Sequence, residues 1–233
     1  MNKPIPDIKD PECFEKLEIT NSKFIEIKTN DIFIIEMQYP LLKMDNGEER
    51  CFVREEVYQK LLLASKLLPK GYKFKILDAW RPFLLQEELF YKYSQKIIKE
   101  FNLEDKSEEE QKEFIKKFVS LPNKNVLIPP VHTTGGAIDL TLVDENGNEL
   151  DMGTYFDEFT DRTNTNYYEN TDLKIKYNRR LLYNIMTSVG FVNLPSEWWH
   201  FDYYDRFWAY YNNEPSKYEG VFEVKDVLKN LKQ

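Results

Sequence analysis

The chain has 233 residues and a formal net charge of −8, and 42% of its residues are hydrophobic. This composition is ample for a sizeable core. The acidic balance argues against a nucleic-acid partner, which requires a basic face.

The length predicts one domain over residues 1–233, because domains average roughly 150 residues, with a lead over 1–22 and an extension over about 204–233. The first six residues lack the apolar core of a secretory signal, and no run approaches the roughly 20 apolar residues of a membrane span. We therefore expect a cytoplasmic protein with no membrane partner, and the sequence leaves the oligomeric state open. Cys13 and Cys51 show no framework spacing and are expected to be free thiols rather than metal ligands.

The first half of the chain is expected to alternate short strands with longer helices. Runs of β-branched and aromatic residues predict the strands, and apolar residues at helical spacing predict the helices. Asn46-Gly47 predicts a tight turn, and Ser107 with Glu110 forms a capping-box pattern before a charge-rich helix. The predicted strands cover 24–28, 32–37 and 72 to about 78, and the predicted helices cover 55–68, 82 to about 101 and 107 to about 119.

The stretch 130–142 contains one of only two histidines in the chain. Beyond Gly135-Gly136, polar and apolar residues alternate, which predicts a strand whose polar face leaves Asp139 pointing into open space. The two glycines allow a sharp turn, because glycine tolerates positive φ. We therefore expect His132 to fold back over this strand and meet Asp139.

A hairpin around Asn146-Gly147 is expected to follow this strand. Residues 158–172 are polar and lack periodicity, which predicts either a lid or a disordered loop beside the site. Apolar residues at helical spacing then predict a helix over 173–189, with Gly190 after its end.

The second histidine, His200, lies three residues after Glu197. We expect Glu197 in a turn and His200 at the start of a strand from 199 to 203. A lone histidine is usually a surface or hydrogen-bonded core residue, but both histidines here lie near a carboxylate. Catalytic zinc sites use three protein ligands and keep a fourth position for water. His132, Asp139 and His200 could form such a set, with Glu197 left as a base.

Five short segments carry a family resemblance. They are DAWRP at 78–82, HTTGGAID at 132–139, MGTYFD at 152–157, NRRL at 178–181 and EWWH at 197–200. In this order and spacing they resemble the motifs of the zinc D-alanyl-D-alanine dipeptidase (VanX-type) family of D,D-peptidases. The resemblance covers somewhat over half of the chain, and it departs from the family at Trp80, which replaces a tyrosine.

The resemblance implies one zinc D,D-peptidase domain that hydrolyses the dipeptide D-alanyl-D-alanine to two D-alanines. We expect an α+β fold, with a small, mainly antiparallel sheet flanked by helices and one zinc ion per chain in a single cleft. Two alternatives stay open. One is a peptidoglycan D,D- or L,D-carboxypeptidase or endopeptidase of the same superfamily, which normally needs export or a wall-binding module. The other is a non-catalytic zinc-binding module.

The resemblance also implies roles for residues around the zinc. Glu197 matches the general base that takes a proton from the water that zinc activates. Arg81 is expected to stabilise the developing oxyanion, because guanidinium is always charged. Its alternative role is a structural salt bridge with Asp78, and both roles can hold together, with Asp78 orienting Arg81. Asp157 matches the residue that holds the substrate ammonium, or it could cap a loop. Pro130 stands where the family usually has a serine that helps to hold this amine.

Overall fold

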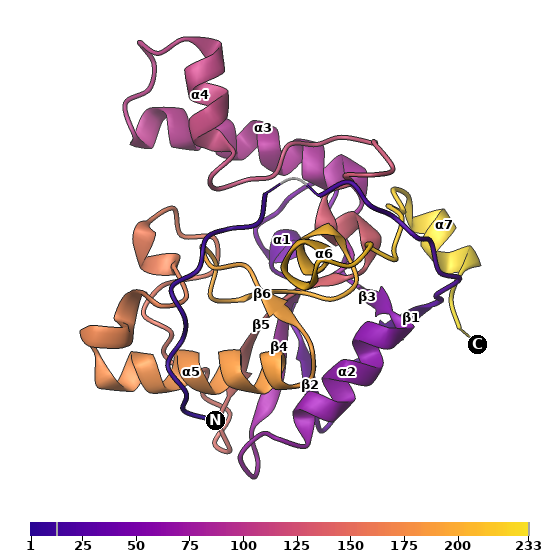
Figure 1. The fold of residues 1–233 in the computed structure, drawn as a ribbon, viewed down its shortest axis with the longest axis vertical. Coiled ribbons are helices and arrows are strands. Elements are labelled where there is room, and N and C mark those ends of the chain that lie inside the picture. The colour runs from indigo at the N-terminus through magenta and orange to yellow at the C-terminus, as the bar shows by residue number, and fades with distance from the viewer. Residues whose placement is uncertain (13, 233) are drawn as a thin grey trace.

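The structure, a computed structural model, describes residues 1–12 and 14–232, so Cys13 lies outside the described residues. Short strands alternate with helices along the chain (Figure 1). The strands are β1 (Phe24–Ile27), β2 (Phe33–Ile35), β3 (Cys51–Arg54), β4 (Lys73–Asp78), β5 (Ala137–Val143), β6 (Val192–Asn193) and β7 (His200–Asp202). The helices are α1 (Gln38–Leu41), α2 (Glu55–Ser65), α3 (Phe83–Glu100), α4 (Glu108–Ile115), α5 (Leu173–Ser188), α6 (Arg206–Asn212) and α7 (Val224–Lys229), with 3-10 helices η1 (Val131–Thr134), η2 (Asp161–Thr163) and η3 (Tyr167–Asn170).

A five-stranded sheet with the order β2-β4-β5-β7-β6 forms the centre of the molecule. Its β2–β4 pair is parallel, and its other pairs are antiparallel. The strands β1 and β3 form a separate antiparallel pair. The fold is therefore α+β, with mainly antiparallel sheets flanked by helices, as the sequence predicts. Neither β3 nor α1 was among the predicted elements.

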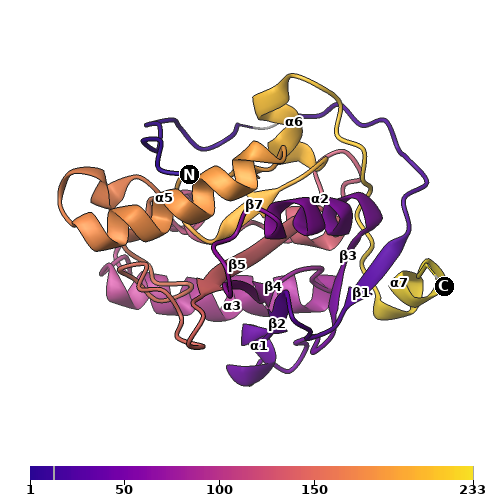
Figure 2. The same cartoon turned by 90° about the horizontal axis from the view of Figure 1, so that it is seen from below.

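Helices cover both faces of the large sheet: α2 and α5 lie on one face, and α1 and α3 lie on the other (Figure 2). On the α2/α5 face, Ile138 and Leu140 of β5 join Leu61 and Leu182 in the main core. The opposite face of β5 carries Asp139, whose side chain is also buried. The expectation that Asp139 points into open space is therefore wrong. The alternation of apolar and polar residues in β5 indicates one apolar face, but it does not show whether helices cover the polar face as well.

The helices α3 and α4 form a lobe at one end of the molecule (Figure 1). Ser107 and Glu110 make both hydrogen bonds of the predicted capping box at the start of α4. The helix ends at Ile115, earlier than predicted, and the chain turns back toward the sheet. The lobe has its own small core, in which the ring of Phe118 lies 5.6 Å from the ring of Phe159.

Several hydrogen bonds from outside the segment hold residues 158–172, and two of them come from the buried side chain of Arg179 in α5. Its guanidinium donates hydrogen bonds to the backbone oxygens of Met152, Arg162 and Asn164, at 2.8, 2.8 and 2.6 Å. The segment also contains η2 and η3. The disordered-loop alternative is therefore wrong, because hydrogen-bond partners outside the segment, Arg179 among them, hold it in place.

The two terminal segments return to the elements around η1 and β7. In the lead, the Asp10 carboxylate accepts a hydrogen bond from the Ser196 N–H at 3.0 Å. In the extension, the Val221 N–H donates to the Thr133 oxygen at 2.8 Å. Trp208 of α6 joins the main core, whereas α7 packs with Phe24 beside the β1–β3 pair. The extension thus adds Trp208, Ala209 and Tyr218 to the main core, and α7 to the smaller cluster.

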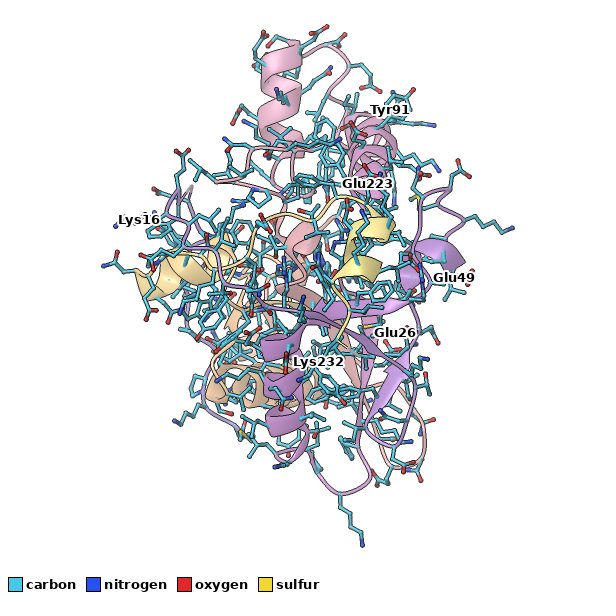
Figure 3. All side chains as sticks on the ribbon, turned by 90° about the vertical axis from the view of Figure 1, so that its right-hand side faces the viewer. Lys16, Glu26, Glu49, Tyr91, Glu223 and Lys232 are labelled. Atoms are coloured by element: carbon cyan, nitrogen blue, oxygen red, sulfur yellow. The ribbon has the colours of Figure 1, made fainter. Side chains whose placement is uncertain are left out.

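Charges of both signs are distributed over the face shown in Figure 3, where the labelled charged residues are Lys16, Glu26, Glu49, Glu223 and Lys232. Lys232 pairs with Glu55 at the start of α2, which ties the C-terminal residues to that helix. Among the described helices, none has the length and apolar character needed to cross a membrane.

The turn that ends η1 generates a prediction for stability. Gly135 has a φ of +75°, and a Cβ at this position would lie 2.5 Å from the Phe24 ring. We expect Gly135→Ala to lower the free energy of unfolding by about 2–4 kcal/mol, through left-handed strain and overpacking together. Gly147, with a φ of +86° and open space around it, is the matched control. Its replacement by alanine should cost only about 1–2 kcal/mol. Urea unfolding of both variants tests this, and equal losses would show that the Phe24 contact is unimportant.

Candidate active site

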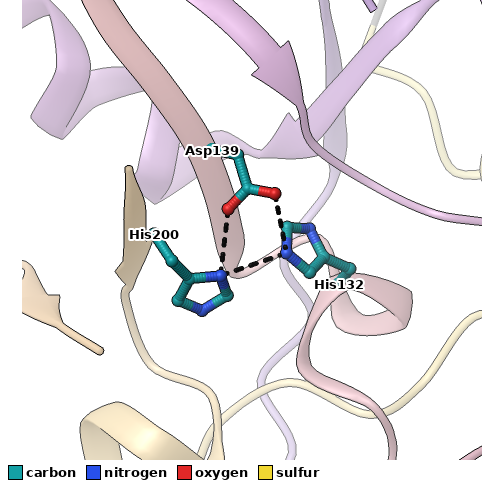
Figure 4. A group of neighbouring side chains, drawn as sticks. All are labelled: His132, Asp139 and His200. Atoms are coloured by element: carbon teal, nitrogen blue, oxygen red, sulfur yellow. Dashed lines mark hydrogen bonds and ion pairs between the residues drawn. The ribbon is translucent and has the colours of Figure 1, made fainter. Parts of the chain in front are cut away.

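His132, Asp139 and His200 point toward one another beside β5 (Figure 4). His132 Nε2 lies 3.2 Å from His200 Nδ1 and 3.4 Å from Asp139 Oδ2, and His200 Nδ1 lies 3.0 Å from Asp139 Oδ1. Tetrahedral zinc with bonds of about 2.0–2.1 Å places its ligand atoms about 3.3 Å apart. The two histidine nitrogens face different oxygens of Asp139, and one ligand atom from each of the three residues lies within 4.8 Å of the others, so the group has nearly the spacing that a zinc ion between them requires.

The outer nitrogens of the two imidazoles have acceptors that fix their tautomers. His132 Nδ1 lies 2.8 Å from the Ala79 backbone oxygen, and His200 Nε2 lies 2.8 Å from Asp202 Oδ1. Because both oxygens accept hydrogen bonds, these nitrogens carry the protons. The lone pairs of His132 Nε2 and His200 Nδ1 are then directed toward the centre of the group, which is the arrangement that metal-binding histidines use.

The ionisation of the three side chains also suits a bound cation. Burial opposes the ionised form of Asp139, but His132 and His200 lower the pKa of its carboxyl below the usual range. Burial lowers the pKa of His200, but Asp202 and Asp139 raise it well above its usual value. In the metal-free group a proton and a metal ion therefore compete for the lone pair of His200. An ionised carboxylate with two imidazoles is a donor set that suits zinc.

Glu197 lies in the turn between β6 and β7, as predicted, with His200 at the start of β7. Its Oε2 lies 3.8 Å from His200 Nδ1, and its side chain is 25% exposed. Burial raises the pKa of the Glu197 carboxyl to about 8, and the nearby charge of His200 lowers it in part. A carboxyl group with a pKa near neutrality can both accept and release a proton.

Arg81 follows β4, and nearly all of its guanidinium N–H groups donate hydrogen bonds. Its Nε and Nη2 donate to Asp78 Oδ2 at 2.9 and 2.7 Å, its Nη1 donates to Gln86 at 2.8 Å, and its Nη2 also donates to the Tyr39 hydroxyl at 3.1 Å. These bonds use four of the five guanidinium N–H groups. One N–H on Nη1 has no hydrogen-bond partner among the described residues. Asp78 therefore makes the predicted salt bridge, and it orients a guanidinium with one donor left over.

Asp157 is held by two tyrosines that the sequence did not predict. Tyr39 of α1 and Tyr93 of α3 donate hydrogen bonds to Asp157 Oδ2 at 2.9 and 2.8 Å. Burial and the nearby charge of Asp139 raise the pKa of the Asp157 carboxyl to about 6, against the opposing effect of the hydrogen bond from Tyr93. Both tyrosines lie in helices far from Asp157 in sequence, and no local motif marks them. Pro130 lines the same site without a side-chain donor.

One cavity of about 50 Å³ brings these residues together. It is lined by the two histidines and Asp139, by Glu197 and Arg81, and by Asp157. Asp78, by contrast, is not part of its wall and contacts the cavity through Arg81. The structure thus places the predicted catalytic, metal-binding and substrate-binding side chains around a single small space.

Comparison with known proteins places the chain among dipeptidases. Residues 41–219 match the family model described as D-ala-D-ala dipeptidase. The chain is 38% identical to a D-alanyl-D-alanine dipeptidase of Synechocystis over 71% of this chain and 72% of that protein. It is 49% identical to one of Escherichia coli over 34% of this chain and 40% of that protein. A zinc-bound mutant of a vancomycin resistance D,D-pentapeptidase has 15% identity and a TM-score of 0.41, with 88% of this chain and 97% of that chain covered.

The raised pKa of Asp157 predicts a pH-dependent stability. The native carboxyl, with a pKa of about 6, keeps its proton where the unfolded one, with a pKa of 3.8, has lost it. Stability should therefore fall as the pH rises from about 4 to 6. In metal-free protein, Asp157→Asn should remove this loss and gain up to about 3 kcal/mol at pH 7, with little change below pH 4. Urea unfolding at both pH values measures the effect. Exposed Asp105→Asn is the control, and a gain that is equal at both pH values would contradict the assignment.

Proposed function

Because the chain belongs to the D-Ala-D-Ala dipeptidase family, which consists of zinc metallopeptidases, we propose that it hydrolyses the free dipeptide D-alanyl-D-alanine to two D-alanines. The observation that carries this proposal is the cavity of about 50 Å³, in which the candidate metal ligands and Glu197 face Asp157. A space this small favours a small substrate over a peptidoglycan strand. A carboxylate at one side of it suits a free ammonium group. The cytoplasmic location stays a prediction.

We assign His132 Nε2, Asp139 and His200 Nδ1 as the ligands of one zinc ion. Bound there, zinc would polarise the scissile carbonyl and lower the pKa of a water molecule in the cavity. The Ala79 oxygen and Asp202 hold the two imidazoles in the orientation and tautomer that this requires.

Glu197 moves the proton in this proposal. It takes a proton from the attacking water as the water oxygen bonds to the scissile carbonyl carbon. It then gives this proton to the leaving amine as the C–N bond breaks. Its carboxylate lies within 3.8 Å of His200 Nδ1, so it borders the place where the water must lie. The pKa of about 8 applies without a metal, and a bound cation would lower it toward the working range of a general base.

Arg81 and Asp157 hold the two polar ends of the reacting residue. The remaining Nη1 N–H of Arg81 can donate to the scissile carbonyl oxygen as negative charge develops on it. Asp157 accepts from the substrate ammonium. The Tyr39 hydroxyl contacts both side chains, donating to Asp157 at 2.9 Å and accepting from Arg81 at 3.1 Å. It thereby fixes their separation.

Paired variants separate the base from a ligand. Glu197→Gln keeps the shape but cannot take a proton, so zinc content should stay near one per chain while kcat falls roughly 10²–10⁴-fold. His200→Ala removes a donor and should lose zinc and activity together. Zinc content by elemental analysis and kcat with D-Ala-D-Ala check both, with exposed Glu104→Gln as the control. Full zinc occupancy in His200→Ala would sink the ligand assignment.

N-acetylation distinguishes the dipeptidase from a carboxypeptidase. N-acetyl-D-Ala-D-Ala lacks the ammonium that Asp157 would bind, which leaves a buried carboxylate without a partner. We expect kcat/KM for the acetylated substrate to be at least about 10²-fold below that for D-Ala-D-Ala. Asp157→Ala should reduce this discrimination. Equal values for the two substrates in the wild type would favour the peptidoglycan carboxypeptidase instead.

A further inference from the structure

A second cavity of about 230 Å³ adjoins the active-site cavity. Three residues, Phe118, Asp157 and Glu197, line both cavities. The remaining walls of the second cavity come from the lead, from the segment after α4, from residues 158–164, and from Ser196 and Trp199 before β7. It is the larger of the two spaces, and the reaction proposed above makes no use of it.

The chemistry of a dipeptide determines which substrate group borders this space. The Cα of the N-terminal residue is bonded both to the ammonium nitrogen and to the scissile carbonyl carbon. If Asp157 holds the ammonium and Glu197 faces the carbonyl, this Cα lies between them. Both carboxylates are walls that the two cavities share. The side chain on that Cα is therefore placed at the junction of the cavities.

We propose that the second cavity is a subsite for the side chain of the N-terminal residue, so that the substrates include dipeptides in which this side chain is larger than methyl. This inference rests on the proposed function and deepens it. The active-site cavity, at about 50 Å³, leaves no space for a longer side chain beside the dipeptide backbone. The neighbouring 230 Å³ is the space open to a longer side chain.

The walls of this subsite indicate which side chains it prefers. Phe118, Phe159 and Trp199 supply aromatic surface, which suits an apolar stem. Asp10 and Asp161 line the cavity and are exposed, so they lie at its outer side. Glu158 also lines the cavity but pairs with Arg162, and Lys117 is the one cation among the lining residues, so Asp10 and Asp161 leave the outer side negative. A side chain that ends in a cation should therefore bind better than one that ends in a carboxylate.

The test uses zinc-loaded protein and a series of D-Xaa-D-Ala dipeptides in which Xaa is Ala, Leu, Lys or Glu. We expect kcat/KM for D-Leu-D-Ala and D-Lys-D-Ala within about tenfold of that for D-Ala-D-Ala, because the second cavity takes up the longer side chain without displacing the dipeptide backbone. The value for D-Glu-D-Ala should lie at least about tenfold below that for D-Lys-D-Ala. Values for D-Leu-D-Ala and D-Lys-D-Ala more than about 100-fold below D-Ala-D-Ala would overturn the inference.

A variant that fills the cavity provides the second arm. Thr160 lines only the second cavity, so Thr160→Trp should keep turnover of D-Ala-D-Ala and lower that of D-Leu-D-Ala and D-Lys-D-Ala at least about tenfold. Thr187→Trp, on α5 away from both cavities, is the matched control. An equal loss on all substrates with Thr160→Trp would count against a subsite.

A charge variant covers the case in which Thr160→Trp does not fold. Asp161 is exposed, so Asp161→Lys should leave the fold intact and lower the D-Lys to D-Glu preference at least about threefold. An unchanged preference would contradict the electrostatic part of the proposal. If no D,D-dipeptide is hydrolysed, D-Ala-D-Ala included, the proposed function itself fails and the subsite with it. Turnover of D-Ala-D-Ala alone overturns only the subsite.

Discussion

The register between β5 and β7 is the constraint on which the candidate site depends. It pairs Asp139 directly with His200. Directly opposed residues of antiparallel strands project to the same face with Cβ atoms about 4.5–5.5 Å apart, so both side chains reach one point. On the other side of β5, the register pairs Asp139 with Asp78 after an irregularity in β4. A slip of one residue in either pairing would send one side chain to the apolar face.

The paired residues of β4, β5 and β7 concentrate negative charge in the interior. Asp78, Asp139 and Asp202 are all buried. Buried carboxylates are costly unless they are paired. Arg81 offsets Asp78, and the two histidines offset the other two carboxylates. Burial and the neighbouring Asp202 also raise the pKa of the Asp205 carboxyl well above its usual value, which disfavours a further buried negative charge. A divalent cation among the candidate ligands would add to this compensation, and it would take the place of a proton at Nδ1 of His200.

Two buried arginines, Arg54 and Arg179, hold the loops around the site in place. Arg54 donates hydrogen bonds to the backbone oxygens of Ser22, Thr134 and Glu219. Arg179 likewise donates to three backbone oxygens, those of Met152, Arg162 and Asn164, on either side of Asp157 in the sequence. Buried backbone carbonyls need donors, and irregular loops cannot supply these from a ladder. Each guanidinium therefore replaces the hydrogen bonds that regular structure would provide. The loop before β5 and the loop that carries Asp157 acquire fixed positions in this way.

The sequence by itself determined the features that depend on near neighbours. Period-two alternation and two glycines predicted that His132 meets Asp139, and the spacing to His200 predicted the turn at Glu197. Only the tertiary structure decided the burial of Asp139, because α1 and α3 cover its face from distant parts of the chain. The same holds for the contacts of Tyr39 and Tyr93 with Asp157 and for the order that Arg179 gives to residues 158–172. These interactions join residues far apart in sequence, and periodicity and turn chemistry act over only a few residues.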